Sequence, residues 1–417
     1  MKIIYLVIFL LIGMNQIQGN QPELLNPLEL LEWSIGNGNP FNIVIEVEGN
    51  GKVDHQKLYQ SALTMFNSHS QLQKQVTSYE GEFYFNRVSQ SRLPIYVVED
   101  YSVKTALNST FDRNSYLWNL ILVEKENGFS LYLRLHHVLG DGISAMELMK
   151  ELLSHYEDSL ILIESNDSVT WYNRLQGVKH VEEASRFADK CGTKEVLLGG
   201  TNVLSFTLDH ASQFTKLCKE KGVRVQAFLL ALMLKAVDQT SLTKSFPSDV
   251  LSHHLVNMRS HVEPPVPNNT LRCVISQLEF PVERSVERTF WEEAKHYSEM
   301  IDQMLKNGEA EKTLEEVGNL LASNIDGPSF SPSVKIPTLC ITNIGRSGPL
   351  DSQDLAIKNA RLHVTTHSIY QAPALLLAVN TYDDNLNFQL HYPDYYISEE
   401  DISEFVETFQ GIFHALF

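Results

Sequence analysis

The sequence predicts an α+β fold of two lobes, each with a mixed β-sheet flanked by helices. The chain has 417 residues, 43% of them hydrophobic and 20% charged, which is typical of a globular protein large enough for two medium lobes. The expected strands and helices follow one another without strict alternation, and this favours mixed sheets over a doubly wound parallel sheet. Between residues 158 and 200 the periodicity fades and polar residues dominate, so we expect the crossover between the lobes around 175–200.

The first half opens with a short helix, expected from Asn26 to Trp33, with Pro27 in its first turn. A strand is expected over 41–48, and Asp54 is placed to cap the helix that follows. Apolar periodicity predicts this helix over 55–67, strands over 83–85, 94–98, 118–123 and 129–135, and a helix over 143–156.

The second half repeats the opening plan of the first. A strand over 203–208 is followed by Asp209 and His210, which open a helix as Asp54 and His55 do earlier. This repeat suggests two related lobes. Further helices are expected over 225–237, 290–305 and 399–413, and strands over 250–256, 272–279, 338–344, 361–367, 375–380 and 386–391.

The amino terminus has the pattern of a secretory signal peptide over residues 1–19. Lys2 precedes an apolar run over 3–12, polar residues follow, and a small residue, Gly19, ends the segment. The alternative is a membrane anchor, but a span needs about 20 apolar residues, so we expect no stable membrane span. We expect a secreted protein or one of the endoplasmic reticulum lumen. Three glycosylation triplets agree with this route, and they begin at Asn108, Asn166 and Asn268.

The net charge and the cysteine content argue against two classes of partner, nucleic acid and a zinc ion bound by the cysteines. The formal net charge is −18, which argues against a nucleic-acid partner because phosphate binding needs a basic surface. The four cysteines allow three pairings, and the sequence does not choose among them. Their spacing is not that of a zinc site. They are Cys191, Cys218, Cys273 and Cys340.

Two adjacent histidines, His136 and His137, stand at the end of the strand expected over 129–135. A Gly-Asp-Gly turn containing Asp141 follows, and then the next helix begins. Because consecutive strand side chains point to opposite faces, one histidine can face a cavity while the other is buried as support. The same divergence disfavours a metal held by both histidines and Asp141. The arrangement therefore favours one positioned general base and no metal.

The motif His136-His137-x-x-x-Asp141-Gly142 resembles the coenzyme A-dependent acyltransferase superfamily. This superfamily includes chloramphenicol acetyltransferase, the condensation domains of peptide synthetases and the polyketide-associated acyltransferases. Two further segments resemble it, Val256-Asn257-Met258-Arg259 and Ile341-Thr342-Asn343-Ile344-Gly345-Arg346. The Asp-Phe-Gly-Trp-Gly motif of the plant branch is absent, so the chain resembles the condensation-domain and polyketide-associated branches more closely.

The resemblance implies two chloramphenicol acetyltransferase-like lobes, 20–185 carrying the motif and 186–417 following it, with a channel between them. It makes His137 the general base and His136 its buried support. It also implies a structural ion pair between Asp141 and Arg259 beside Gly142.

Thr342 and Asn343 are expected either to hydrogen-bond the substrate or to close the lobe interface. The expected partners are a small-molecule acyl donor and acceptor, with acyl-CoA or another acyl thioester as co-substrate, no bound cofactor and a monomeric chain. His253-His254 lacks the Asp-Gly sequel and is expected to be structural.

Two functions from different classes remain open at this point. The first is an O- or N-acyltransferase of the secretory pathway. The second is a secreted small-molecule or lipid-binding protein with the same fold and no turnover. Ester hydrolysis, with water in place of the acceptor, is a third possibility. No Gly-x-Ser-x-Gly elbow, phosphate loop or dinucleotide fingerprint supports another chemistry.

Overall fold

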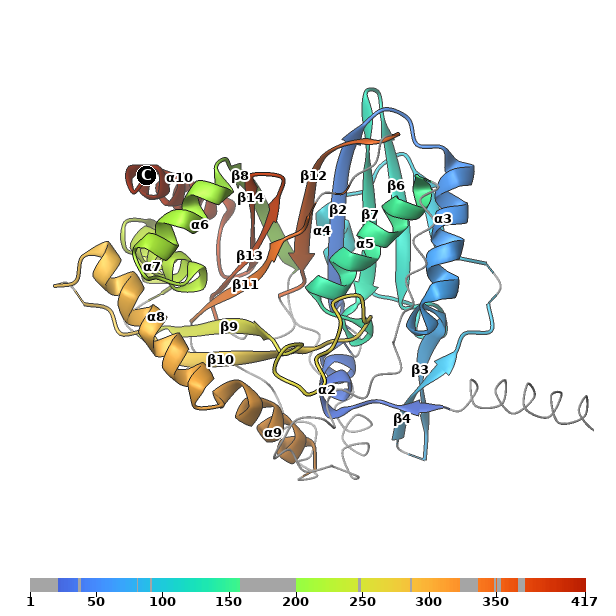
Figure 1. The fold of residues 1–417 in the computed structure, drawn as a ribbon, viewed down its shortest axis with the longest axis horizontal. Helices are drawn as coiled ribbons and strands as arrows, with labels where there is room; N and C mark the ends of the chain where they lie inside the picture. Colours follow the sequence, from blue (N-terminus) through green and yellow to red (C-terminus); the bar gives the residue numbers. More distant parts are fainter. Residues whose placement is uncertain are drawn as a thin grey trace, which may run out of the picture.

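The computed structural model of the chain describes residues 22–36, 39–80, 82–90, 92–157, 200–246, 249–285, 287–322, 337–348, 350, 354–366 and 372–417. The signal peptide, the triplet at Asn166, Cys191 and the lobe boundary at 185/186 lie outside these residues. The described residues form two lobes side by side, each built on a mixed sheet (Figure 1). The predicted α+β class with two lobes is confirmed.

The first lobe is built on a five-stranded sheet of order β12-β2-β7-β6-β5. Its strands are β2 (Asn42–Asn50), β5 (Ile95–Val98), β6 (Trp118–Lys125), β7 (Gly128–His136) and β12 (Ala356–Val364). All pairs are antiparallel except β5 with β6. The odd-numbered side chains of β2 face the core under α3 (His55–Ser68) and α5 (Gly142–Tyr156), and Val44 faces α4 (Val103–Asn108) on the other side.

The amino-terminal segment of the described chain forms a smaller unit beside this sheet. A three-stranded sheet of order β1-β4-β3 contains β1 (Glu23–Leu24), β3 (Lys74–Tyr79) and β4 (Glu82–Arg87). The helix α2 (Pro27–Ile35) follows β1 and contacts both the turn after β7 and α9 of the second lobe. Figure 1 shows α2 between the two lobes. Trp33 of this helix packs against His136 at the end of β7.

The second lobe is built on a six-stranded sheet of order β10-β9-β11-β13-β14-β8. Its strands are β8 (Thr201–Leu208), β9 (Leu251–Asn257), β10 (Ile275–Pro281), β11 (Thr338–Arg346), β13 (Ala374–Tyr382) and β14 (Asn385–Pro393). Its helices are α6 (Ala211–Glu220), α7 (Val225–Asp238), α8 (Phe290–Lys306), α9 (Glu309–Ala322) and α10 (Glu399–Ala415). The almost wholly apolar α7 lies in the core of this lobe, as its composition predicts.

One strand crosses between the lobes. β12 comes from the second half of the sequence, but it pairs antiparallel with β2, with Ala360 opposite Val47. The lobes are therefore not divided strictly in sequence order, because the edge of the first sheet is closed by a strand that arrives after β11. The pairing of β12 with β2 therefore connects the two lobes near the motif.

The repeated pattern at the helix starts is only partly structural. The Asp54 carboxylate accepts hydrogen bonds from the backbone N–H groups of Gln56 and Lys57, so it caps α3 as predicted. At the start of α6, His210 has a left-handed backbone and makes no side-chain cap. The cap comes instead from Asp384, which accepts from the backbone N–H of Ser212. The similarity of the two halves at this point is thus one of sequence and not of capping geometry.

Candidate functional site

The motif lies where the structure changes from strand to helix. β7 ends at His136, a single turn covers His137–Leu139, and α5 begins at Gly142. The two histidine rings have different neighbours: His136 packs against Trp33, with ring centroids 5.4 Å apart, whereas His137 stacks on Phe41 at 4.9 Å. Both side chains are buried, with 4% and 8% of their surface exposed. Adjacent positions therefore have separate environments.

His136 is held as a neutral ring. Its Nδ1 atom accepts a hydrogen bond of 3.1 Å from the backbone N–H of Val138. Burial, together with the charges of His137, Arg113 and Arg134, lowers the pKa of His136 to about 3. Since Nδ1 is an acceptor and the ring is uncharged, the proton resides on Nε2. That Nε2 atom is buried, and no hydrogen-bond partner lies beside it in the part of the chain that the structure describes.

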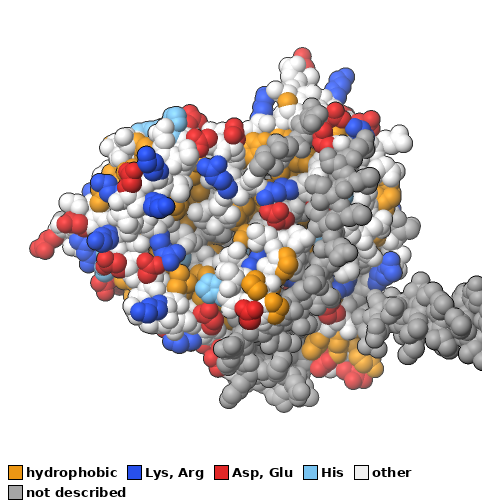
Figure 2. All heavy atoms as spheres, in the orientation of Figure 1, with side chains coloured by type: hydrophobic (Ala, Val, Ile, Leu, Met, Phe, Trp, Pro, Cys, Tyr) orange, Lys and Arg blue, Asp and Glu red, His pale blue; other side chains and the backbone are white. Residues whose placement is uncertain are grey.

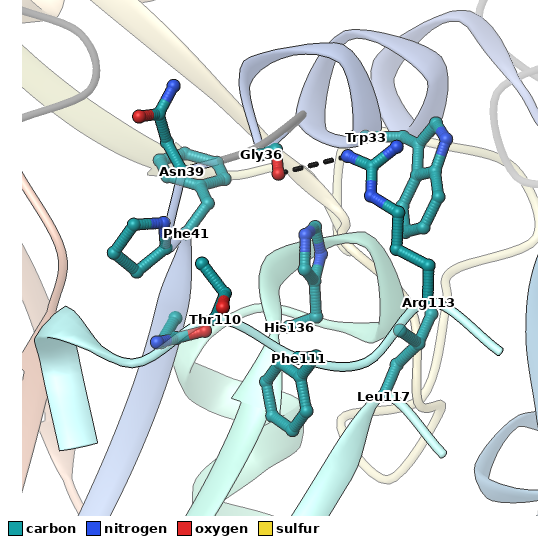
Figure 3. Close-up of a pocket in the computed structure, with 11 residues that line it drawn as sticks. Trp33, Gly36, Asn39, Phe41, Thr110, Phe111, Arg113, Leu117 and His136 are labelled. Carbon is teal, nitrogen blue, oxygen red and sulfur yellow. Dashed lines mark hydrogen bonds between the residues drawn. The ribbon is translucent and has the colours of Figure 1, made fainter. Parts of the chain in front are cut away.

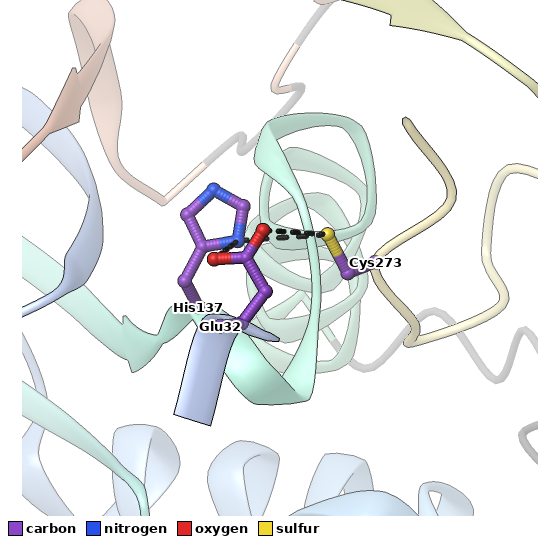
Figure 4. Close-up of side chains that lie close together, drawn as sticks. All are labelled: Glu32, His137 and Cys273. Atoms are coloured by element: carbon purple, nitrogen blue, oxygen red, sulfur yellow. Dashed lines mark hydrogen bonds and ion pairs between the residues drawn. The ribbon is translucent and has the colours of Figure 1, made fainter. Parts of the chain in front are cut away.

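His137 has a carboxylate and a thiol beside its Nδ1 atom (Figure 4). The Oε2 atom of Glu32 and the Sγ atom of Cys273 each lie 3.6 Å from Nδ1. The thiol also lies 3.9 Å from Oε1 of Glu32. Figure 4 shows the other ring nitrogen, Nε2, turned away from both groups. Three elements distant in the sequence thus meet at one face of this ring.

The protonation states follow from this packing. Burial raises the pKa of the Cys273 thiol well above its usual range, with the Glu32 charge adding to the effect, so the sulfur is a neutral S–H group. Burial also raises the pKa of Glu32, but His137 and the Cys273 thiol oppose that rise. A carboxylate beside Nδ1 favours the tautomer with the proton on Nδ1, which leaves the lone pair of Nε2 available. With Glu32 beside its Nδ1 atom, His137 can therefore supply a neutral base at Nε2.

Asp141 and Arg259 form a buried, bidentate ion pair. The Arg259 guanidinium donates to Oδ2 of Asp141 at 2.6 Å and to Oδ1 at 3.1 Å. The carboxylate also accepts from the backbone N–H groups of Ser144 and Val274. Despite complete burial, the Arg259 charge and these hydrogen bonds lower the pKa of Asp141. The structure thus joins the two charges that the resemblance pairs, and the pair fastens the start of α5 to the segment before β10.

Gly142 lies in a close contact of the same region. A Cβ atom there would stand 3.0 Å from Leu362 of β12 and 3.2 Å from Ile344 of β11. The space that a side chain at Gly142 would need is therefore occupied by side chains of β12 and β11, the two strands that approach α5 from the second half of the sequence. A glycine allows this approach without displacing either strand.

Thr342 and Asn343 lie on β11, on the strand that reaches α5 through Ile344. The Oδ1 atom of Asn343 accepts a 2.9 Å hydrogen bond from the backbone N–H of Gly345, where the strand turns. Both side chains are partly exposed. Their predicted contact with substrate stays a prediction, and the observed bond gives Asn343 a local role in the turn.

His253 and His254 have partners of their own away from the motif. His253 pairs with Glu279 across β9 and β10 at 2.8 Å, and His254 lies 2.9 Å from the hydroxyl of Ser252. These contacts agree with the structural role expected for both residues.

One group of side chains could hold a metal. Glu32, His137 and Cys273 offer an oxygen, a nitrogen and a sulfur within 4.8 Å of one another, a donor set that suits zinc. The sequence analysis considered a different metal-ligand set, His136, His137 and Asp141. This set does not form, because the Asp141 carboxylate is bound to Arg259.

Sequence reasoning missed Glu32 and Phe41 and gave Cys273 no role at the site. Their proximity depends on α2 packing between the lobes, which no local pattern reveals. The one available signal was weak: Glu29 and Glu32, three residues apart, share a face of an otherwise apolar helix. Both prove to be buried.

Comparisons with known proteins bear on the family and on the fold. Residues 200–391 match the family described as the phthiocerol/phthiodiolone dimycocerosyl transferase C-terminus. A comparison with curated protein sequences gave no match.

Solved structures share the fold over almost the whole chain. Polyketide synthase associated protein 5 from Mycobacterium tuberculosis has 17% sequence identity and a TM-score of 0.69, over 94% of this chain and 98% of that one. Trichothecene 15-O-acetyltransferase from Fusarium sporotrichioides has 12% identity and a TM-score of 0.67, over 94% and 93%. The condensation domain of the Monacolin K polyketide synthase has 12% identity and a TM-score of 0.66, over 94% and 96%.

At these identities the likeness of the structures establishes the fold, and the family match covers much of the second lobe. The fold and the family match therefore agree with the resemblance of the chain to the coenzyme A-dependent acyltransferase superfamily.

Proposed function

We propose that the protein moves an acyl group from a thioester donor to a hydroxyl or amine acceptor in the secretory pathway, with His137 as the general base. The observation that carries the proposal is the Glu32 carboxylate beside Nδ1 of His137, with Nε2 directed away from it. A carboxylate in this position fixes the tautomer that a base at Nε2 needs and stabilises the imidazolium that forms.

The proposed step is direct transfer. Nε2 of His137 takes the proton from the acceptor O–H or N–H as the oxygen or nitrogen attacks the thioester carbonyl carbon. The tetrahedral intermediate then collapses, the C–S bond breaks, and the proton passes from Nε2 to the leaving thiolate. The products are an ester or amide and a free thiol. Such proton transfer contributes about 10²–10⁴-fold to the rate, and holding both substrates together contributes much of the rest.

Direct transfer fits the state of Cys273 better than a covalent acyl-cysteine does. A nucleophilic cysteine needs a lowered pKa, whereas burial raises the pKa of this thiol. In the proposal Cys273 donates to Glu32, and Asp141 with Arg259 keeps the turn after β7 in place. Thr342 and Asn343 remain the proposed substrate contacts on β11.

The donor is proposed to be acyl-CoA or another acyl thioester, used as a substrate and not as a resident cofactor. With a net charge of −18 the chain offers no general attraction to an anionic donor, so binding has to be local. On the face shown in Figure 2, basic and acidic side chains are interspersed over both lobes. A neutral or short carrier thioester fits this surface as well as coenzyme A does.

The secretory location rests on the amino-terminal pattern and the glycosylation triplets. Among the described residues, no helix is both long and apolar enough to cross a bilayer. Of the two described triplets, Asn268 is exposed, whereas the Asn108 side chain donates to Lys104 and Thr201 and accepts from the backbone N–H of Thr201. We therefore propose Asn268 as the preferred glycosylation site of these two, and peptide mass spectrometry of secreted protein tests this.

The proposal is tested by incubating purified mature protein with acyl thioesters of several chain lengths and a panel of alcohols and amines. Release of free thiol together with a new ester or amide, detected by mass spectrometry, is the expected result. Thiol release with free acid as the only product would instead indicate a hydrolase. Saturable binding without any turnover would favour the binding-protein alternative.

A further inference from the structure

The structure contains a pocket on the His136 side of the motif, separate from the Glu32 face of His137 (Figure 3). Its volume is about 170 Å³, room for roughly six water-sized groups at about 30 Å³ each. Gly36 and residues 39–41, which precede β2, form one wall, and lining residues from Thr110 to Leu117, which precede β6, form the other. The apolar part of the lining consists of Trp33, Pro40, Phe41, Phe111 and Leu117.

The polar part of the lining is rich in donors. His136 contributes an Nε2–H group that is buried and has no hydrogen-bond partner among the described residues. Arg113 contributes a guanidinium that lies over the Trp33 ring at 4.3 Å and donates to the Gly36 carbonyl at 3.1 Å. No lining residue is acidic, although the chain as a whole has a net charge of −18.

The two donors converge at Gly36. The carbonyl oxygen of Gly36 binds Arg113, and a Cβ atom on Gly36 would stand 2.4 Å from Nε2 of His136. Figure 3 shows the His136 ring directed toward Gly36 and the Arg113 guanidinium beside the same residue. Gly36 therefore covers Nε2 of His136, which leaves the half-buried Arg113 as the donor for a ligand at this end of the pocket.

Arg113 also lacks a compensating charge. Among the described residues no carboxylate lies within ion-pair distance of its guanidinium, and partial burial alone lowers its pKa. A partly desolvated cation without a counter-ion is unfavourable unless a ligand supplies the opposite charge. The apolar walls then leave room for a short hydrocarbon body behind the charged head.

We propose that this pocket binds a small carboxylate with a short apolar body, whose oxygens accept hydrogen bonds from the guanidinium of Arg113. Phe41 lines the pocket and also stacks on His137. A ligand in the pocket would therefore be separated from the proposed base only by the Phe41 ring. The proposal concerns binding and does not require that the protein turn over an acyl donor.

The test uses the purified mature chain and two matched probes, sodium butyrate and the uncharged butyramide, in isothermal titration calorimetry at low chloride. We expect saturable butyrate binding in the millimolar range and at least tenfold weaker binding of butyramide. Arg113→Gln should weaken butyrate binding at least tenfold, and Arg113→Lys, which keeps the charge, should weaken it less. Arg92→Gln, which alters an exposed arginine outside the pocket, serves as the control and should bind as the parent does.

Equal affinity for the acid and the amide would overturn the proposal, as would the absence of saturable butyrate binding. Unchanged binding by a folded Arg113→Gln variant would also overturn it, and Arg113 would then be a packing partner of Trp33 only. If Arg113→Gln does not fold, the relative affinities of the parent chain for butyrate and butyramide decide whether the pocket recognises the carboxylate. Because acyl transfer is not measured, failure here and failure of the proposed function are distinguishable.

Discussion

The Nδ1 atom of His137 lies 3.6 Å from the Oε2 atom of Glu32, a carboxylate carried by the helix α2. Both side chains are almost fully buried, and Cys273 of the second lobe lies beside them. The motif histidine is thus oriented by a residue far from the motif in sequence. This relationship connects the packing of α2 between the lobes with the chemistry proposed at His137.

Replacing Glu32 with glutamine tests that connection. The amide keeps the volume of the side chain but removes the charge that favours a proton on Nδ1, so kcat should fall at least about tenfold while KM stays within about twofold. Steady-state kinetics with a thioester donor measure both constants. A Glu32→Gln variant with the kcat of the parent would show that the carboxylate does not orient the base.

Cys273→Ala separates direct transfer from a covalent acyl-cysteine route. Because the thiol is neutral and acts as a donor to Glu32, its removal should lower kcat only a few-fold. Mass spectrometry of protein quenched during turnover should show no acylated Cys273. Complete loss of transfer in a folded Cys273→Ala variant, or an acyl adduct on this residue, would contradict the proposed step.

The ion pair between Asp141 and Arg259 should matter chiefly for stability. Removing either partner leaves the other charge buried, and we expect Asp141→Ala and Arg259→Ala each to lower the free energy of unfolding by about 3–5 kcal/mol. Urea unfolding measures this, with Lys57→Ala as a control that breaks a surface ion pair and should cost less than about 1 kcal/mol. If both variants have the same free energy of unfolding as the parent, the ion pair does not stabilise the fold.

The buried neutral histidines predict sensitivity to acid. The pKa values of His136 and His254 are lowered to about 3, and that of His391 lies well below the ordinary value of 6.5. Below pH 6.5 the unfolded chain takes up protons at these histidines that the folded chain does not, so their contribution to stability is full above this pH and is lost toward pH 3. The slope is about 1.4 kcal/mol per pH unit for each such histidine.

Unfolding free energies measured between pH 7 and pH 4 test this slope. His254→Gln, at a buried position in the second lobe, should flatten the decline relative to the parent, whereas the exposed His55→Ala should leave it unchanged. The same pH dependence in the parent and in a folded His254→Gln variant would contradict the buried, neutral state of His254.

Gly36 should tolerate no side chain without rearrangement. An added Cβ would stand 2.4 Å from Nε2 and 2.8 Å from Cε1 of His136, so Gly36→Ala should lower the free energy of unfolding by about 1–3 kcal/mol. Gly411→Ala, in the middle of α10 with open space around it, is the matched control and should stabilise the protein by up to about 1 kcal/mol. Equal melting temperatures for the two variants would show that the contact at Gly36 is not tight.

The local features of the site could be predicted from the sequence, because they depend on neighbouring residues. The sequence predicts different environments for His136 and His137 at a strand end, and the structure places them so. The reason differs from strand alternation, because β7 ends at His136 and His137 belongs to the turn that follows. The Asp54 cap of α3 is equally local. The resemblance added the long-range contact of Asp141 with Arg259.

The features that the sequence did not reveal depend on packing between distant elements. Glu32 meets His137 only because α2 lies between the lobes, and β12 joins the first sheet only because the chain crosses back after β11. Asp384 caps α6 from a remote turn, so the local resemblance of Asp209 to Asp54 was misleading. The pocket at His136 likewise needs two separate segments to close around it.

The role of His137 as the general base is tested most directly by the rate of acyl transfer by His137→Ala, measured as thiol release and product formation alongside a melting curve. We expect the rate to fall by about 10²–10⁴-fold or below detection while the melting temperature stays near that of the parent. His136→Ala, in contrast, should chiefly lower the melting temperature, because this ring packs against Trp33 and Phe111. A folded His137→Ala variant that transfers acyl groups at the rate of the parent would contradict the assignment of His137 as the general base.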